Sequence, residues 1–339
     1  MLKHILGVLL FYAIFSLTSV VYSQSGKIKG YMFGDYYYVA QNNDTSLESR
    51  NGFWFRRIYL TYDHKLNDEF AVRFRIELNS PGDFTARSKL EPFLKDGYLK
   101  WAKSRHAIII GLSPTPTWNY IEKIWGYRSV EKTPADLYKF GSSRDLGVAF
   151  QGSFDREKRL RYHFMFSNGS STRAETNKGK KLLLALGYQL TPELSVEVYG
   201  DWEERPGKTN RYSAQGFLGY RKEKLRLGAQ LLHQTRQQEG EDEELQLLSV
   251  FGAAQLEQKL WAFLRYDRSF DPISAGPTIS YIPFNGGAKF NFVLAGLDFS
   301  PHKQVHFMPN VELTFYDEVA GERPDTDLIP RFTFYYIWK

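Results

Sequence analysis

The fold is decided by residues 53–79, FWFRRIYLTYDHKLNDEFAVRFRIELN. They predict two strands joined by a tight turn at 66–68, where Asn and Asp supply the turn chemistry. In both strands apolar side chains alternate with Arg, Asp, Glu and tyrosine side chains, and successive side chains of a strand point to opposite faces. Each apolar run covers about ten residues, enough to cross a bilayer at a tilt near 45°. This hairpin therefore has one face suited to lipid and one suited to water.

The rest of the chain repeats this hairpin, and alternation together with turn signals predicts about sixteen strands. They are expected near 27–40, 52–64, 69–79, 94–103, 106–113, 144–154, 159–168, 180–190, 193–203, 211–222, 224–234, 245–256, 259–269, 288–299, 304–316 and 328–338. The connections are alternately short and long along the chain. An even strand number with short turns at one end and long loops at the other is typical of bacterial outer-membrane barrels. The predicted fold class is therefore all-β, a transmembrane antiparallel β-barrel formed by residues 24–339.

The first 23 residues fit a secretory signal peptide, with Lys3 and His4 ahead of an apolar run and cleavage expected before Gln24. A membrane anchor helix is the alternative, although the run is short for a span of about 20 residues. After this segment no long apolar run recurs, and the mean hydropathy is −0.43. The 22 Tyr, 26 Phe and 7 Trp suit the aromatic girdles of a membrane barrel. The net charge of +6 shows no clustering that would indicate nucleic-acid binding.

The longest predicted connection, residues 114–143, follows the fifth strand and is rich in aromatic side chains. A loop of this length in a compact protein is usually functional or disordered, and this one has enough apolar content to pack. We expect it to enter the lumen as a constriction loop, with a helical turn near 120–125. A surface loop that packs on a neighbouring protomer is the alternative. The candidate constriction residues are Trp118, Tyr120, Lys123, Arg128, Lys132 and Lys139.

Four segments carry a resemblance to a known family. They are FRRIYL at 55–60, GLSPTP at 111–116, RSVE at 128–131 and SRDLGVAFQG at 143–152. Together they resemble the phosphate-selective porin O and P family, over roughly residues 28–155. Membership of this family implies a sixteen-stranded homotrimer with a ladder of lumenal arginines and a basic constriction.

The alternation also predicts which charged side chains line the lumen. The expected inward cations are Arg57, Arg73, Arg75, Lys100, Arg161, Lys181, Arg226, Arg265, Lys289 and Arg331. The expected inward anions are Asp63, Glu77, Asp96, Asp145, Glu197, Asp201, Asp267 and Glu312. Arg57, Arg73 and Arg75 lie on adjacent strands and could form one basic stripe that concentrates anions. The alternative is that these arginines pair with the neighbouring carboxylates and hold the wall in shape.

The predicted function is passive diffusion of small hydrophilic solutes, with a mild preference for anions and phosphate as one candidate. No catalytic triad or metal-ligand spacing stands out, and no cofactor is expected. The expected partners are outer-membrane lipid and lipopolysaccharide, the solutes themselves and two further copies of the chain in a homotrimer. A barrel enzyme, either phospholipase or protease, and a non-conducting structural barrel remain as alternatives.

Overall fold

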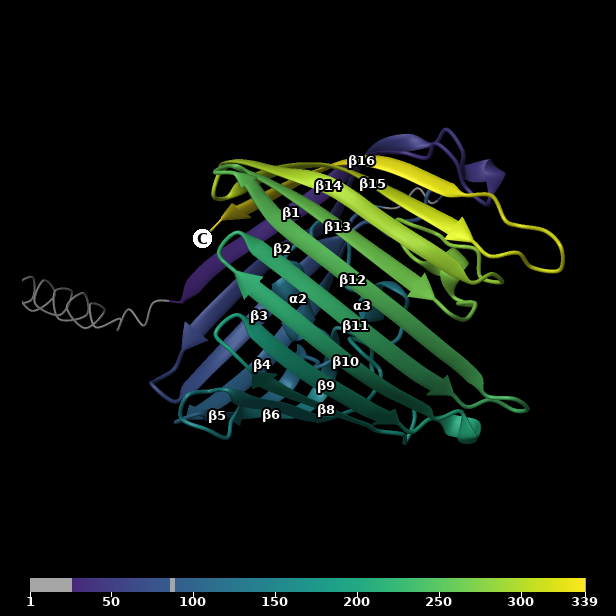
Figure 1. Ribbon diagram of the computed structural model, residues 1–339. Coiled ribbons are helices and arrows are strands. Elements are labelled where there is room, and N and C mark those ends of the chain that lie inside the picture. Colours follow the sequence, from purple (N-terminus) through teal and green to yellow (C-terminus); the bar gives the residue numbers. More distant parts are fainter. Residues whose placement is uncertain (1–25, 86–88, 339) are drawn as a thin grey trace, which may run out of the picture.

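The computed structural model describes residues 26–85 and 89–338, so the predicted signal peptide lies outside the described residues. In the described ranges sixteen antiparallel strands form one closed barrel, in which each strand pairs with its neighbours in sequence and β1 pairs with β16 (Figure 1). The strands are β1 Lys27–Tyr38, β2 Asn51–Lys65, β3 Phe70–Asn79, β4 Glu91–Lys103, β5 His106–Pro114, β6 Arg144–Ser153, β7 Leu160–Ser167, β8 Lys181–Gln189, β9 Leu194–Glu203, β10 Arg211–Lys222, β11 Leu225–Arg236, β12 Glu243–Glu257, β13 Leu260–Ser269, β14 Phe290–His302, β15 Val305–Tyr316 and β16 Asp327–Trp338. The predicted strands are confirmed, and their ends differ from the prediction by at most three residues. None of the helices in the described ranges is long and apolar enough to cross a membrane.

The alternation of side chains gives the barrel an apolar outside. In β8 the side chains of Leu182, Leu184 and Leu186 point outward and are 37–42% exposed, whereas Leu183 and Ala185 between them are buried inside. The same pattern recurs around the barrel, with exposed leucines and aromatic residues on nearly every strand. A continuous apolar surface of this kind is unfavourable in water and suits contact with lipid chains.

Two of the four bulges or register irregularities in the described strands bring a cation into the lumen. In β2 the pairing with β1 passes from Arg57 to Phe55, which leaves Arg56 as an extra residue whose side chain is 3% exposed and turned inward. In β4 the pairing with β3 passes from Asp96 to Leu94, and the extra residue Lys95 also contacts a lumenal carboxylate. Strict alternation from the inward residues Arg57 and Asp96 would put their neighbours Arg56 and Lys95 on the lipid face. Each bulge therefore adds a cation to the lumen that the sequence pattern does not predict.

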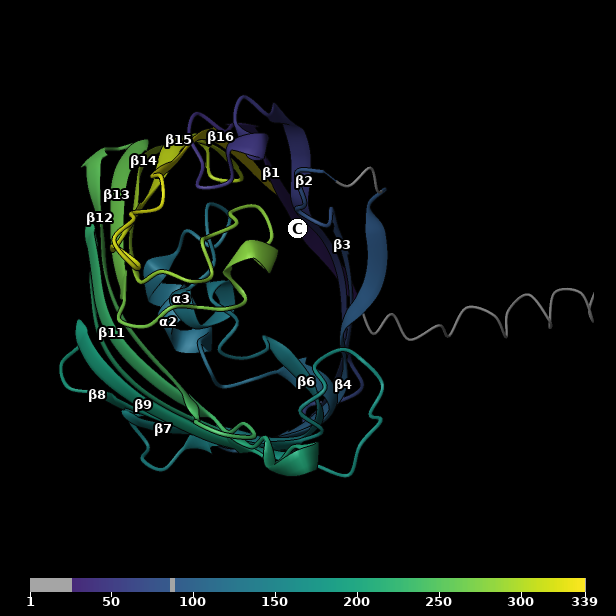
Figure 2. The same ribbon diagram turned by 90° about the vertical axis from the view of Figure 1, so that its right-hand side faces the viewer.

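The loop of residues 114–143, here the first inward loop, lies inside the barrel as predicted, and Figure 2 shows it within the ring of strands. Its helix α2, Asn119–Trp125, confirms the predicted helical turn and packs against β10, β11 and β12. Ile121, Ile124 and Trp125 recur at helical spacing and form its buried face. A second helix, α3, is one short turn at Pro134–Leu137. The loop therefore crosses from β5 and β6 to the opposite wall.

The first inward loop is held mainly by its aromatic side chains. Trp118, Trp125 and Tyr138 are at most 2% exposed and belong to one core cluster that also includes inward side chains of β10 to β15. A large aromatic side chain buries about 150–250 Å², which at roughly 25 cal/mol per Å² favours the inward position by about 4–6 kcal/mol before entropy is counted. The aromatic content of the loop thus explains its place inside the barrel.

Residues 270–287, most of the connection between β13 and β14, also enter the lumen, which the sequence pattern does not predict. This stretch carries the one-turn helix η3, Gly276–Thr278, and lies beside α2 and α3 in Figure 2, where it is the yellow-green segment inside the ring. Ile279 and Phe284 are at most 2% exposed and join the same core cluster as the first inward loop. We refer to residues 270–287 as the second inward loop.

Candidate functional site: a charged constriction and a basic vestibule

The barrel wall opposite α2 carries a group of ion pairs centred on Glu77 of β3. Arg57 Nε lies 2.6 Å from Glu77 Oε1, and Lys95 Nζ lies 2.9 Å from Glu77 Oε2. The Glu77 side chain is 2% exposed, whereas the two cations are 11% and 14% exposed. Two cations thus share one buried carboxylate, and one positive charge of this group has no counter-charge.

A second group of the same kind is centred on Asp96 of β4. Arg75 Nη1 lies 3.2 Å from Asp96 Oδ2, and Arg144 of β6 contacts the other oxygen of the same carboxylate. Arg73 completes the wall and binds Asp63 at 2.6 Å. Each of the three arginines of the predicted basic stripe, Arg57 included, therefore has a carboxylate partner. The excess positive charge of this wall comes from Lys95 and Arg144, which the stripe did not include.

The side of α2 and α3 that faces this wall carries carboxylates. Arg128 lies 3.6 Å from Glu122 and 3.5 Å from Asp136, so one cation lies between two acids. Loss of water contacts raises the pKa of Glu122, an effect that Arg128 partly offsets. Although burial opposes ionisation, Lys132 and Arg128 hold the pKa of Asp136 below its usual range. The constriction therefore has a cationic wall and, facing it, a loop side on which the acids Glu122 and Asp136 lie against the cations Arg128 and Lys132.

The first inward loop is anchored by a buried charge cluster at the β2 bulge. Arg56 lies 2.7 Å from Asp35 of β1, 3.0 Å from Glu131 of the loop and 3.6 Å from Glu312 of β15. Arg331 of β16 binds Glu312 at 2.6 Å and Asp35 at 3.3 Å. All five side chains are at most 4% exposed. Arg331, predicted to line the pore, points inward but is covered by the loops.

Arg265 of β13 is likewise inward and covered. Its side chain is 1% exposed, pairs with Asp267 and donates a hydrogen bond to the backbone carbonyl of Lys132. Tyr138 of the loop donates to the same Asp267 at 2.8 Å. The Lys132 side chain is 6% exposed, and its burial lowers its pKa to about 7. These residues fasten the loop to the wall of β13.

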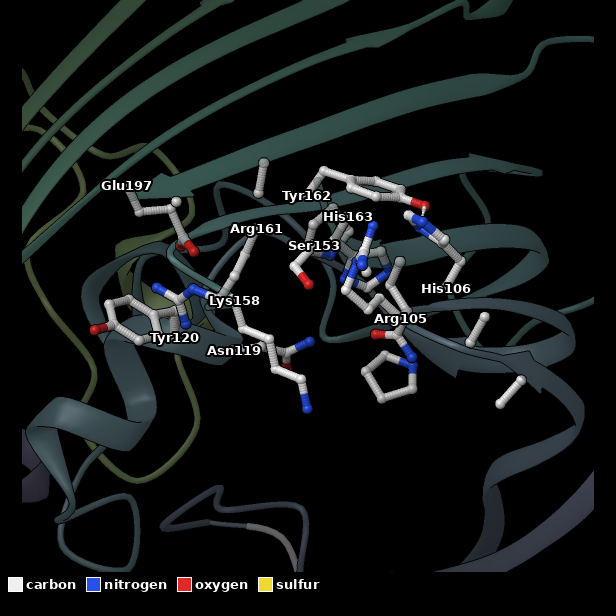
Figure 3. A pocket seen from close by; sticks show the side chains of 18 of the residues that line it. Arg105, His106, Asn119, Tyr120, Ser153, Lys158, Arg161, Tyr162, His163 and Glu197 are labelled. Carbon is white, nitrogen blue, oxygen red and sulfur yellow. Dashed lines mark hydrogen bonds between the residues drawn. The ribbon is translucent and has the colours of Figure 1, made fainter. Parts of the chain in front are cut away.

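A cavity of about 720 Å³ opens at the short-turn end of the barrel, between α2 and the wall formed by β3 to β9 (Figure 3). We call it the basic vestibule. Its charged lining side chains are Arg73, Lys100, Arg105, Lys123, Lys158 and Arg161 against Glu122 and Glu197. Of these cations, only Arg73 has a carboxylate within ion-pair distance in the part of the chain that the structure describes. The vestibule therefore has a large excess of unpaired positive charge.

Arg161 of β7 connects the vestibule to the first inward loop. Its guanidinium lies over the Tyr120 ring, 4.1 Å from the ring centre, and Figure 3 shows Glu197 on its other side. The Tyr120 hydroxyl is hydrogen-bonded to Ser195 of β9. A cation–π contact orients the guanidinium without cancelling its charge, because the ring carries none. Arg161 can therefore still attract an anion.

The remaining predicted residues are dispersed. Arg226 lies inside the barrel between the rings of Tyr127 and Trp261, at 4.9 and 5.0 Å from their centres. Trp118 is buried in the core cluster by which the first inward loop packs against the barrel wall. Lys139 is exposed at the end of the loop, where its backbone carbonyl accepts a hydrogen bond from Arg236 at 3.3 Å. In the described ranges no group of three His, Cys, Asp or Glu side chains is placed to hold a metal ion.

Five cations of the site were not predicted, and one of them is Arg144 of the Asp96 group. Arg56 and Lys95 follow from the bulges, which strict alternation does not anticipate. Arg105 and Lys158 lie in short turns between strands, where alternation assigns no direction to a side chain, and both line the vestibule. The position of these two residues in the sequence could have identified them, because the short turns surround one end of the lumen.

Comparison with known proteins finds the same fold in solved structures of outer-membrane proteins. No protein-family model matches the chain, and no curated protein matches it. Among solved structures, an anion-selective porin from Comamonas acidovorans aligns with a TM-score of 0.66 and 13% identity, covering 93% of this chain and 99% of that chain. OmpF of Salmonella typhi, in complex with daunomycin, aligns with a TM-score of 0.68 and 14% identity over 92% and 97% of the two chains. The trimer form of OmpT, an outer-membrane protein of Vibrio cholerae, aligns with a TM-score of 0.64 and 11% identity over 93% and 99%.

At these identities the likeness shows the fold, which is that of bacterial outer-membrane porins. This fold and the apolar outer face of the barrel indicate the bacterial outer membrane as its location. The resemblance to the phosphate-selective porin O and P family stays a prediction.

Proposed function

We propose that this protein is a passive channel of the outer membrane for small hydrophilic solutes and that it prefers anions. The observation that carries the proposal is the basic vestibule, where five cations without an ion-pair partner in the described ranges line one end of the lumen. The constriction above it adds two further excess positive charges, from the pairs centred on Glu77 and Asp96. A solute that enters through the vestibule meets positive charge along one side of its path.

The preference follows from the position of these charges. Channel selectivity depends on lining charges at close range, and a cleft lined by one sign of charge in a low-dielectric wall raises the local concentration of the opposite ion. The interior of the barrel as a whole is nearly balanced, because most buried arginines pair with carboxylates. We therefore expect a mild preference rather than strict exclusion of cations.

The solved structure from Comamonas acidovorans, named an anion-selective porin, supports the plausibility of anion preference on this fold. The vestibule cations suit oxyanions, because guanidinium and ammonium groups bind phosphate and carboxylate through charge-assisted hydrogen bonds. Phosphate is one candidate among these. We also propose a homotrimer, supported by the trimer form of the Vibrio cholerae protein of the same fold; cross-linking of the protein in native membranes tests it.

Recording in planar lipid bilayers tests the channel and its selectivity. With a potassium chloride gradient across the membrane, the reversal potential is expected to show anion preference, and Lys123→Gln combined with Lys158→Gln is expected to reduce it. Both lysines are exposed in the vestibule and make no ion pair in the described ranges, so their loss leaves the fold intact. The matched control is Lys222→Gln with Lys303→Gln, two exposed lysines that lie outside the vestibule lining.

The recording also separates the alternatives. A barrel that gives no conductance steps but cleaves lipid or peptide is the predicted alternative enzyme, and a barrel without either activity is a structural protein. Cation preference in the wild-type channel contradicts the role given to the vestibule. Comparison of chloride, phosphate and a small carboxylate in the same bilayers then ranks the permeating anions.

A further inference from the structure

We propose that the second inward loop, residues 270–287, is a second constriction element of the channel and that Tyr281 is the residue that positions it. The inference rests on the channel function proposed above and adds a determinant of solute size on the side of the lumen away from the vestibule. Two observations support the inference: the position at which this loop is anchored and the backbone conformation of the anchoring residue.

The second inward loop crosses the lumen. It leaves β13 and returns to β14, and in the order of the barrel β15, β16 and β1 separate β14 from β2. Nevertheless the Tyr281 N–H donates a hydrogen bond of 2.7 Å to the carbonyl of Gly82, beyond β3, and its side chain reaches β2. A loop that only capped its own hairpin would not reach these strands. This one spans the width of four strands inside the barrel.

The Tyr281 side chain is the far anchor of the loop. Its hydroxyl accepts a hydrogen bond of 2.9 Å from Arg57 and lies 2.7 Å from the carbonyl of Ser80, to which it donates. The ring lies 5.0 Å from the guanidinium of Arg56 and 5.0 Å from the Trp54 ring, edge to face. The residue is 1% exposed. The anchor therefore joins the loop directly to the bulge that also holds the first inward loop.

The backbone at this anchor is strained. Tyr281 has a φ of 72°, in the left-handed region that few residues other than glycine adopt. Such a conformation is unfavourable for a residue other than glycine and persists only where surrounding contacts over-determine it. Here those contacts are the hydroxyl bonds and a hydrogen bond from Arg331 to the Tyr281 carbonyl. Strain held in place by buried contacts is more common at functional positions than in loops that merely connect strands.

The other end of the loop rests on the first inward loop. Phe284 contacts Tyr138, with ring centres 5.5 Å apart, and Phe290 of β14 at 5.0 Å. No residue of 270–287 lines the basic vestibule, whose wall comes from β3 to β9 and the first inward loop. The two inward loops thus meet inside the lumen, and the second one extends from β13 and β14 to the bulge of β2.

If this loop limits the channel, its release must widen the lumen while the vestibule stays unchanged. The test compares Tyr281→Gly, which accepts the backbone conformation but removes every side-chain contact, with Tyr281→Phe, which keeps the ring and loses the hydroxyl. Single-channel conductance, the largest polyethylene glycol that enters, and the reversal potential are measured for each. Tyr281→Gly is expected to raise the conductance and the size limit with an unchanged reversal potential, and Tyr281→Phe, which loses the hydroxyl bonds but keeps the ring contacts, to raise both by less.

A second measurement does not depend on a destabilised variant. The chain contains no Cys, so Thr278→Cys, exposed on the same loop, gives a single reactive thiol. Its modification by a bulky thiol reagent is expected to lower the conductance, whereas modification of Glu239→Cys, exposed on the connection between β11 and β12, is expected to leave it unchanged.

The outcomes separate this inference from the proposed function. A conducting wild type whose conductance and size limit are unchanged in a folded Tyr281→Gly barrel, or unaffected by modification of Thr278→Cys, overturns the second constriction alone. A wild-type barrel that never conducts overturns the proposed function and this inference with it.

Discussion

Removal of the Arg56 guanidinium is expected to destabilise the barrel far more than removal of an arginine from the open wall. Arg56→Met keeps a long side chain but leaves Asp35, Glu131 and Glu312 with Arg331 as their remaining buried partner. Loss of one member of a buried, hydrogen-bonded charge group costs about 3–5 kcal/mol, because the charges left behind remain out of water.

The matched control is Arg73→Met. Arg73 makes one ion pair, with Asp63 at 2.6 Å, and the two side chains are 25% and 26% exposed. Ion pairs this open to water contribute about 0–1 kcal/mol, because solvent screens them. The two variants remove the same group from the same barrel, so the difference between their losses in free energy of unfolding, about 3 kcal/mol, measures the effect of burying the ion pairs.

Equilibrium urea unfolding of the refolded barrel in lipid vesicles, followed by tryptophan fluorescence, measures both variants against wild type. The fluorescence also reports the first inward loop, because Trp118 and Trp125 lie in it. If Arg56→Met loses no more free energy of unfolding than Arg73→Met, the buried cluster does not hold the loop and the reasoning from burial is wrong.

Three further changes test other parts of the structure. Burial lowers the pKa of Lys132 to about 7 from an ordinary value of 10.5, so raising the pH through 7 removes a positive charge from the first inward loop. The anion preference measured by the reversal potential is therefore expected to fall as the pH rises through 7. Lys132→Arg is expected to abolish this pH dependence, because arginine stays charged. Between pH 7 and pH 10.5 the Lys132 side chain is protonated in the unfolded chain but largely neutral in the folded one, so the free energy of unfolding is expected to rise with pH. Lys132→Met is expected to remove this rise. Gly126→Ala is expected to lower the melting temperature in a thermal scan, since Gly126 ends α2 with a φ of 73° and a Cβ there meets the Arg226 guanidinium. Leu231→Arg, on an outward residue that is 61% exposed near the middle of β11, is expected to cost about 2–4 kcal/mol in vesicle unfolding, against roughly 0–1 for Leu225→Arg near the strand end.

The strands could be predicted because a membrane barrel imposes one rule on every strand. Residues such as Leu182 and Leu184 must face lipid and Leu183 must not, so alternation is visible in the sequence itself. The first inward loop could be predicted because its aromatic residues require a core to pack in. The second inward loop has a similar apolar content in Ile279 and Phe284, but its anchor at Tyr281 depends on strands remote in sequence.

The charge pattern of the site was harder to predict. Alternation shows that Arg75 and Asp96 share a face, but whether they pair depends on the register between β3 and β4, which a bulge shifts. The same limitation explains why the predicted stripe of arginines is largely paired, whereas the unpaired cations come partly from short turns, as with Arg105. Which charged side chains remain unpaired and accessible to a solute depends on their neighbours on adjacent strands rather than on residue type.

The bulges at Arg56 and Lys95 bear on how the lumen of such a barrel can evolve. Within a regular strand, insertion of one residue reverses the direction of every following side chain, so that lipid-facing side chains point into the lumen and lumenal ones into lipid. Selection eliminates such an insertion. At these two positions the extra residue is absorbed, and the lipid-facing side chains on either side keep their places. A lineage can therefore gain or lose a lumenal cation by a single in-frame insertion or deletion, and change what passes through the pore while the surface in contact with the membrane is inherited intact.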